Sequence, residues 1–252
     1  MTLFEAKRFS MYPTEFAASI VSRLIEIFLY ITFWLIVSKY GTSGNINANQ
    51  IISYYLIVNG ITSFFFTQLG VGSFIIKMVR YGELNQALIK PISPILVPWS
   101  QRAGRNILNN IIGAIQIIAG ILLAGSFNFN SNILLPVIII NTILLNVSFN
   151  IITGTFAFYF TEAGGIKNVF LHLYNLMGGV LMPLFLMPIS IATYLQYTPF
   201  PAAQYHLAAS LQGQYQIETK FVFIGLFWSI VLIIFALKFW KNSLAKYEAV
   251  GM

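Results

Sequence analysis

Side chains that could catalyse a reaction are scarce in this sequence. The chain contains no Cys and no Asp, and its seven acidic residues are all Glu. The two histidines, His172 and His206, lie far apart, so the sequence has no HExxH metal-binding pair. It also lacks the GxxxxGKS or GxxxxGKT loop that cradles ATP phosphates. We therefore expect no catalytic residue, no metal site and no cofactor on this chain.

The composition points to a membrane protein. Of the 252 residues, 58% are hydrophobic and only 8% are charged, whereas a soluble domain carries about 25% charged residues. Six membrane-spanning helices of about 20 residues each would use roughly half of such a chain. We therefore expect an all-α integral membrane protein with six transmembrane helices. Because Lys and Arg collect on the cytoplasmic side of membrane proteins, the net charge of +7 indicates topology and not binding to nucleic acid.

Apolar stretches predict where these helices lie. Their approximate limits are residues 19–37, 51–76, 107–124, 133–160, 169 to the prolines that begin at 183, and 221–240. With the N-terminus inside, only Lys39 and Lys220 of the 14 basic residues lie outside, and the other 12 are cytoplasmic. This distribution predicts a multi-pass protein of the cell (inner) membrane with both termini in the cytoplasm.

One transmembrane domain accounts for residues 1–252 in this interpretation. Residues 1–18 mix apolar and charged side chains, which is typical of an amphipathic segment on the membrane surface. Residues 77–105 form a cytoplasmic loop, residues 161–167 a short loop, and residues 181–215 an outer region.

The cytoplasmic loop at residues 77–105 carries five of the 14 basic residues. Leu84, Ala87, Leu88 and Ile89 give it a helix-like apolar stripe, and a proline at position 91 would end that short helix. The helix could dock into a soluble partner. Alternatively, the loop lies on the membrane and its charges meet anionic lipid headgroups.

The outer region at residues 181–215 is apolar but contains four prolines. Backbone groups that proline frees inside a membrane must be satisfied by protein or water, which favours short helices that re-enter the outer leaflet. These helices could form a lid over a substrate path, or they could only seal the fold.

Amide side chains inside the spans allow two interpretations. They could line a transport path, or they could form hydrogen bonds between helices. The residues in question are Asn59, Gln116, Asn141, Asn146 and Asn175.

The order of these features resembles the permease subunits of type-2 ABC exporters, in the branch of permeases of about this length that often occur in pairs with one ATPase. The resemblance covers the whole chain. It is carried by GELNQALIKPISP, by FTEAGGIKN and by MPLFLMPISIATYLQYTPFPAAQY. It implies that two permeases, identical or different, form a pathway, and that separate ABC ATPase subunits, which bind ATP and Mg, dock on the cytoplasmic side. Membrane lipids are the other expected partner.

The resemblance also assigns roles to residues. The family phrase GxL…LxxP maps onto Gly82, Leu84, Leu88 and Pro91, and it implies that the short helix couples to the ATPase. The expected coupling residues are Lys77, Arg80, Tyr81, Gly82, Glu83, Leu84, Leu88, Lys90 and Pro91. The expected outer lid contains Pro183, Pro188, Pro199, Phe200 and Pro201.

The cargo and the composition of the dimer stay open at this point. The few charges in the spans favour an apolar or amphipathic cargo, and export as the direction follows from the resemblance alone. The alternative function is a secondary carrier, or the membrane subunit of a vitamin-uptake system, without an ATPase of its own.

Overall fold

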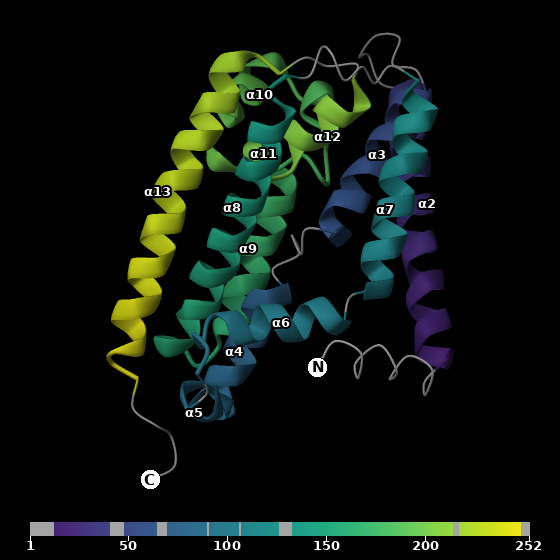
Figure 1. Cartoon of the computed structure of the whole chain (residues 1–252). Coiled ribbons are helices and arrows are strands. Elements are labelled where there is room, and N and C mark those ends of the chain that lie inside the picture. The colour runs from purple at the N-terminus through teal and green to yellow at the C-terminus, as the bar shows by residue number, and fades with distance from the viewer. Residues whose placement is uncertain are drawn as a thin grey trace.

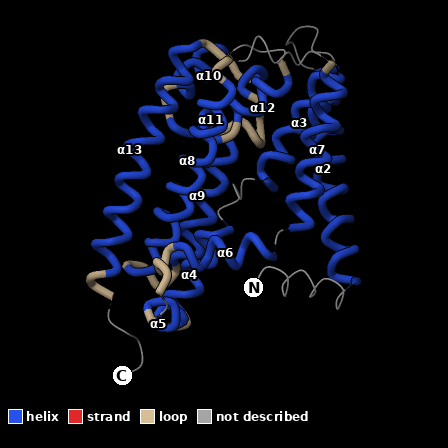
Figure 2. Tube along the Cα trace, in the orientation of Figure 1, coloured by secondary structure: helices blue, strands red, loops and turns tan. Residues whose placement is uncertain are grey.

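A computed structural model describes residues 13–40, 48–64, 70–89, 91–105, 107–125, 133–213 and 217–247. Every regular element within these ranges is a helix (Figure 2), in agreement with the expected all-α class. The longer helices are α2 (Pro13–Tyr40), α3 (Ala48–Phe64), α4 (Gly70–Arg80), α6 (Leu96–Arg105), α7 (Ile107–Ala124), α8 (Leu135–Thr155), α9 (Ala163–Met177) and α13 (Thr219–Leu244). The shorter ones are α5 (Glu83–Leu88), η2 (Phe156–Phe158), η3 (Leu184–Leu186), α10 (Ile189–Gln196), α11 (Pro199–Ala203) and α12 (Tyr205–Gln212).

The long helices run alongside one another between two ends of the molecule (Figure 1). Helices α10, α11 and α12 lie at one end, whereas α4, α5 and α6 lie at the other. The C-terminal end of α13 is at the same end as α5. The predicted outer region and the predicted cytoplasmic loop are therefore at opposite ends, as a membrane protein requires.

Two helices among the described residues are long and apolar enough to cross a membrane, namely Leu135–Phe158 and Thr219–Leu244. Shorter apolar stretches are Leu24–Phe33 and Asn109–Ala124. The predicted limits of the third span coincide with α7, and those of the last span lie within α13. The number of six spans stays a prediction.

Three sequence-based boundaries differ from the structure. Helix α9 begins at Ala163, so residues 163–167 are helical and not a loop; glycines are tolerated there because the first turn lacks intrahelical N–H bonds. Helix α6 occupies part of the predicted loop, although it contains a proline. The expected long second span does not pack as one helix, because α3 packs on α7 whereas α4 packs on α8.

Glycines allow these two helix pairs to approach closely. A Cβ atom at Gly60 of α3 would lie 2.6 Å from the carbonyl oxygen of Gly113 on α7, and one at Gly113 would lie 2.8 Å from the oxygen of Gly60. In the α4–α8 pair, a Cβ atom at Gly72 would lie 2.6 Å from the hydroxyl of Thr153. Small residues at such crossings are typical of membrane proteins, where helices associate by close packing.

Candidate coupling helix and outer region

Helix α5 begins directly after a tight turn at the end of α4. The amide of Tyr81 donates a hydrogen bond to the carbonyl of Lys77 at 2.9 Å, which closes α4. Gly82 follows with a φ of 71°, a left-handed conformation that favours glycine. Glu83 then occupies the first turn of α5, where its negative charge interacts favourably with the helix dipole. The glycine of the GxL phrase is therefore needed for the turn that places α5.

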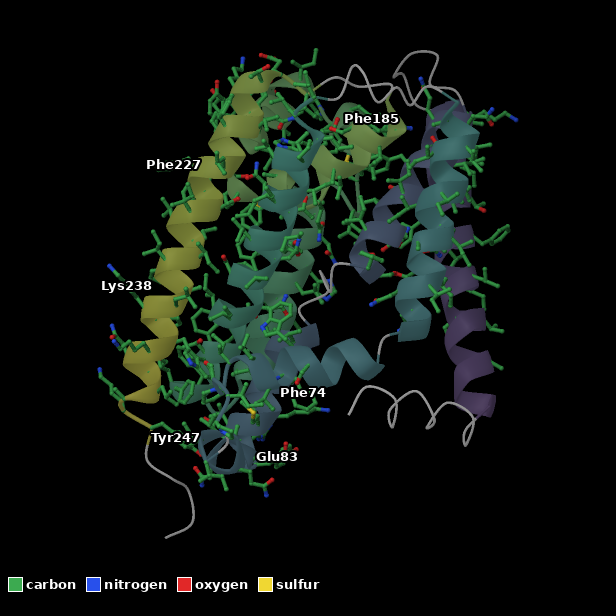
Figure 3. All side chains as sticks on the ribbon, viewed as in Figure 1. Phe74, Glu83, Phe185, Phe227, Lys238 and Tyr247 are labelled. Carbon is green, nitrogen blue, oxygen red and sulfur yellow. The ribbon has the colours of Figure 1, made fainter. Side chains whose placement is uncertain are left out.

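The two faces of α5 have different surroundings. Leu84 and Ala87 are buried in one cluster with residues of α4 and α6. Leu88 is 44% exposed and Ile89 is 85% exposed, and Figure 3 shows Glu83 at the tip of this end of the molecule. The helix is thus fixed by its inner face and leaves an apolar edge uncovered in this chain.

This arrangement changes the part that Leu84 can play. The sequence pattern placed it among residues that contact a partner, but its side chain is fully buried. Leu84 therefore anchors the helix, and only its exposed neighbours are accessible to another molecule. Tyr81 and Pro91 are exposed, whereas Lys90 lies outside the described residues.

The basic residues expected at the coupling site, Lys77 and Arg80, are both exposed on α4. A nitrogen of the Arg80 guanidinium lies 3.4 Å from a carboxylate oxygen of Glu162, at the start of α9. Both side chains of this pair are more than half exposed, so the ion pair contributes little to stability. Both cations remain accessible to another molecule.

Prolines stand at the starts of three short helices of the outer region. Pro183 precedes η3 and Pro188 precedes α10, and Pro199 is the first residue of α11. These positions suit proline because the first turn of a helix needs no intrahelical N–H bond. Pro201 is buried, and Phe200 stacks on Phe149 of α8 with ring centroids 5.7 Å apart. The chain therefore turns back into the bundle at this end.

Tyrosines of α3 hold the segment that leads into this region. The hydroxyl of Tyr54 donates to the carbonyl of Gly179 at 2.7 Å, and the hydroxyl of Tyr55 donates to the carbonyl of Leu181 at 3.0 Å. Both rings are fully buried. The sequence analysis missed these two residues, although two adjacent tyrosines inside an apolar span were a usable signal, because a buried phenol needs a hydrogen-bond partner.

Two of the predicted path residues join helices. The side-chain amide of Asn141 donates to the carbonyl of Val222 on α13 at 3.0 Å, and that of Asn146 donates to the carbonyl of Ala203 at 3.0 Å. The Asn146 oxygen also accepts a hydrogen bond from the hydroxyl of Tyr174. For these two asparagines, the structure matches the second interpretation, hydrogen bonding between helices.

The other three predicted path residues are placed differently. Asn59 donates to the carbonyl of Tyr55 in its own helix at 2.9 Å. The side-chain oxygens of Gln116 and Asn175 are buried and have no hydrogen-bond partner within the described part of the chain. A transport path along Gln116 and Asn175 stays a prediction.

The fold and the site together define a class of protein, a helical membrane protein whose two ends differ in structure. Residues 23–251 match the family model described as ABC-2 family transporter protein. The chain therefore belongs to the ABC-2 transporter family, and this confirms the resemblance noted in the sequence. A comparison with curated proteins gave no match.

Proposed function

We propose that this protein is the membrane-spanning permease subunit of an ATP-driven exporter. Two permeases, identical or different, form the pathway between them, and separate ABC ATPase subunits supply the energy and carry the ATP and Mg. The proposal is supported by membership of the ABC-2 transporter family over most of the chain. The ATPase docks on α5, with Lys77, Arg80 and Glu83 around the contact.

The main observation that supports α5 as the docking site is that its two faces are buried to different extents. Leu84 and Ala87 hold the helix against the bundle, while Leu88 and Ile89 expose apolar surface at the very end of the molecule. An exposed apolar edge rimmed by charged residues is typical of a protein–protein contact. The outer helices α10–α12 act at the opposite end as a lid over the pathway.

Substitution of Ile89 by Asp tests this proposal. The permease is coexpressed with a candidate ABC ATPase subunit, purified, and assayed for permease-dependent ATP turnover. A charge in the centre of the contact should weaken docking about tenfold or more, so stimulated turnover should fall at limiting ATPase. Ile89→Asp should leave the thermal stability of the permease unchanged, because Ile89 is 85% exposed.

Ile133→Asp is the matched control, because Ile133 is 86% exposed and lies at the start of α8, near the outer end. It should retain full stimulation. Equal losses in both variants, or no loss in Ile89→Asp, would show that the ATPase docks elsewhere.

A further inference from the structure

A pocket of about 440 Å³ lies beside α5, at the end of the molecule predicted to face the cytoplasm. Its walls come from the end of α4, from the turn that follows α8, and from the end of α13. The residues that line it are Ile76, Val79, Arg80, Phe158, Phe160, Lys246 and Tyr247, together with Ala157, Tyr159, Thr161 and Ser243. The pocket shares one residue, Arg80, with the proposed ATPase contact, and the rest of its lining belongs to neither the docking surface nor the proposed pathway.

Two cations line the pocket. Arg80 is in contact with the exposed carboxylate of Glu162, at a distance that gives a weak ion pair. Lys246 is exposed and has no ion pair within the described residues. Two positive charges thus face a single negative one, and the pocket attracts anions.

Tyr247 also lines the pocket, but its hydroxyl oxygen is shielded from it. This oxygen is buried and has no hydrogen-bond partner in the described part of the chain. The ring is held in place by Phe158, whose centroid lies 5.6 Å away in an edge-on arrangement.

The remaining walls are apolar, with Ile76, Val79 and Phe158 beside the cations. A ligand that fits both the cationic side and the apolar walls of the pocket has a negatively charged group with several acceptor oxygens, joined to an apolar body. A phosphodiester joined to acyl chains has this chemistry, and basic pockets on the cytoplasmic side of membrane proteins bind such headgroups. Inorganic phosphate shares the acceptor oxygens but has no apolar part.

We propose that this pocket binds the headgroup of an anionic phospholipid. Arg80 and Lys246 hold the phosphate oxygens by charge-assisted hydrogen bonds. The lipid would connect the end of α4, directly before the coupling helix, to the end of α13.

The test measures binding of lipid to the purified full-length permease by native mass spectrometry, with phosphatidylglycerol and phosphatidylcholine as probes. Phosphatidylglycerol should bind more tightly to the wild-type protein. Lys246→Gln should weaken its binding about fivefold. Lys238→Gln is the matched control, because Lys238 is exposed on α13, shortly before Lys246 in the chain, but lies away from the pocket (Figure 3), and it should bind like the wild type.

Glu162→Gln provides a test in the opposite direction. It removes the carboxylate that competes for Arg80, so binding of phosphatidylglycerol should become tighter, which a damaged fold could not produce. Equal losses in Lys246→Gln and Lys238→Gln, or equal affinity for the two lipids, would overturn the proposal. Competition by millimolar inorganic phosphate as effective as that by phosphatidylglycerol would also overturn it, because the site would then bind free phosphate.

Discussion

At the scale of single residues, several buried polar side chains donate hydrogen bonds to the backbone of other segments. Tyr54 and Tyr55 bind carbonyls at positions 179 and 181, and Asn141 and Asn146 bind carbonyls of α13 and α11. The carbonyls of Gly179, Leu181 and Ala203 lie at or just beyond the C-terminal end of a helix, where intrahelical partners are missing. The side chains thus supply hydrogen bonds that water cannot supply inside a membrane.

Tyr54→Phe should lower the free energy of unfolding by about 1–2 kcal/mol, because it leaves the buried carbonyl of Gly179 without its hydrogen bond at 2.7 Å. Equilibrium unfolding in mixed micelles measures the change. Tyr194→Phe is the control, since Tyr194 is 77% exposed, and it should have little effect. Equal stability of the two variants would mean that the Tyr54 hydroxyl adds nothing to the fold.

At the scale of the elements, the helix pairs depend on glycines at their crossings, and the short helices depend on prolines at their starts. Gly60 and Gly113 face each other across α3 and α7, and neither has room for a Cβ atom. Pro188 directly precedes α10, and Pro199 is the first residue of α11. Glycine and proline therefore have different roles here. Glycine lets two helices pack closely, and proline marks where one helix is separated from the next.

Gly60→Ala should destabilise the protein by roughly 1–3 kcal/mol. Its Cβ atom would lie 2.6 Å from the carbonyl oxygen of Gly113 and 2.6 Å from Cγ1 of Ile117, so α3 and α7 must separate. Thermal unfolding in detergent measures the loss.

Gly164→Ala is the matched control, because no atom lies within 4 Å of its Cβ position in α9. Alanine favours a helix over glycine by up to about 1 kcal/mol, so this variant should be neutral or more stable. A stable Gly60→Ala variant would contradict the close crossing of α3 and α7.

At the scale of the whole molecule, the two ends are built for different surroundings. One end has the buried helices α11 and α12 held inside the bundle, and the other has the exposed α5 with basic residues around it (Figure 1). This difference is what an exporter subunit needs if ATP hydrolysis at one end is to open a lid at the other. It depends on the predicted orientation, with both termini in the cytoplasm.

Single cysteines can test this orientation, because the chain contains no Cys of its own. Ile89→Cys should be protected from a membrane-impermeant maleimide in intact cells and react after permeabilisation. Ile133→Cys, which is equally exposed, should react in intact cells. The reverse pattern would invert the topology and place α5 on the outside, where no ATPase could reach it.

Much of the fold was predictable because its signals are local. The limits of α7 and α13, the short helix at residues 83–88 and the broken outer region all follow from apolar runs and prolines that neighbouring residues define. The start of α9 and the helix α6 were not predicted, because Gly164 and Pro98 are common loop residues that tertiary packing tolerated here. The candidate site was predicted as a segment, but which of its residues face outward was not.

Composition alone was enough to place this chain in a membrane and to exclude common catalytic chemistry, because the transfer of each side chain between water and lipid depends little on its neighbours. The roles of Leu84, Tyr54 and Asn146 depend instead on what packs against them. Tyr54 and Gly179 are 125 residues apart, and no local pattern brings them together. In the folded protein Leu84 is buried and Ile89 is exposed, and Arg80, Lys246 and Tyr247 line one pocket. These outcomes depend on the tertiary structure, because the burial and the net charge of a site are set by helices that are distant in the chain.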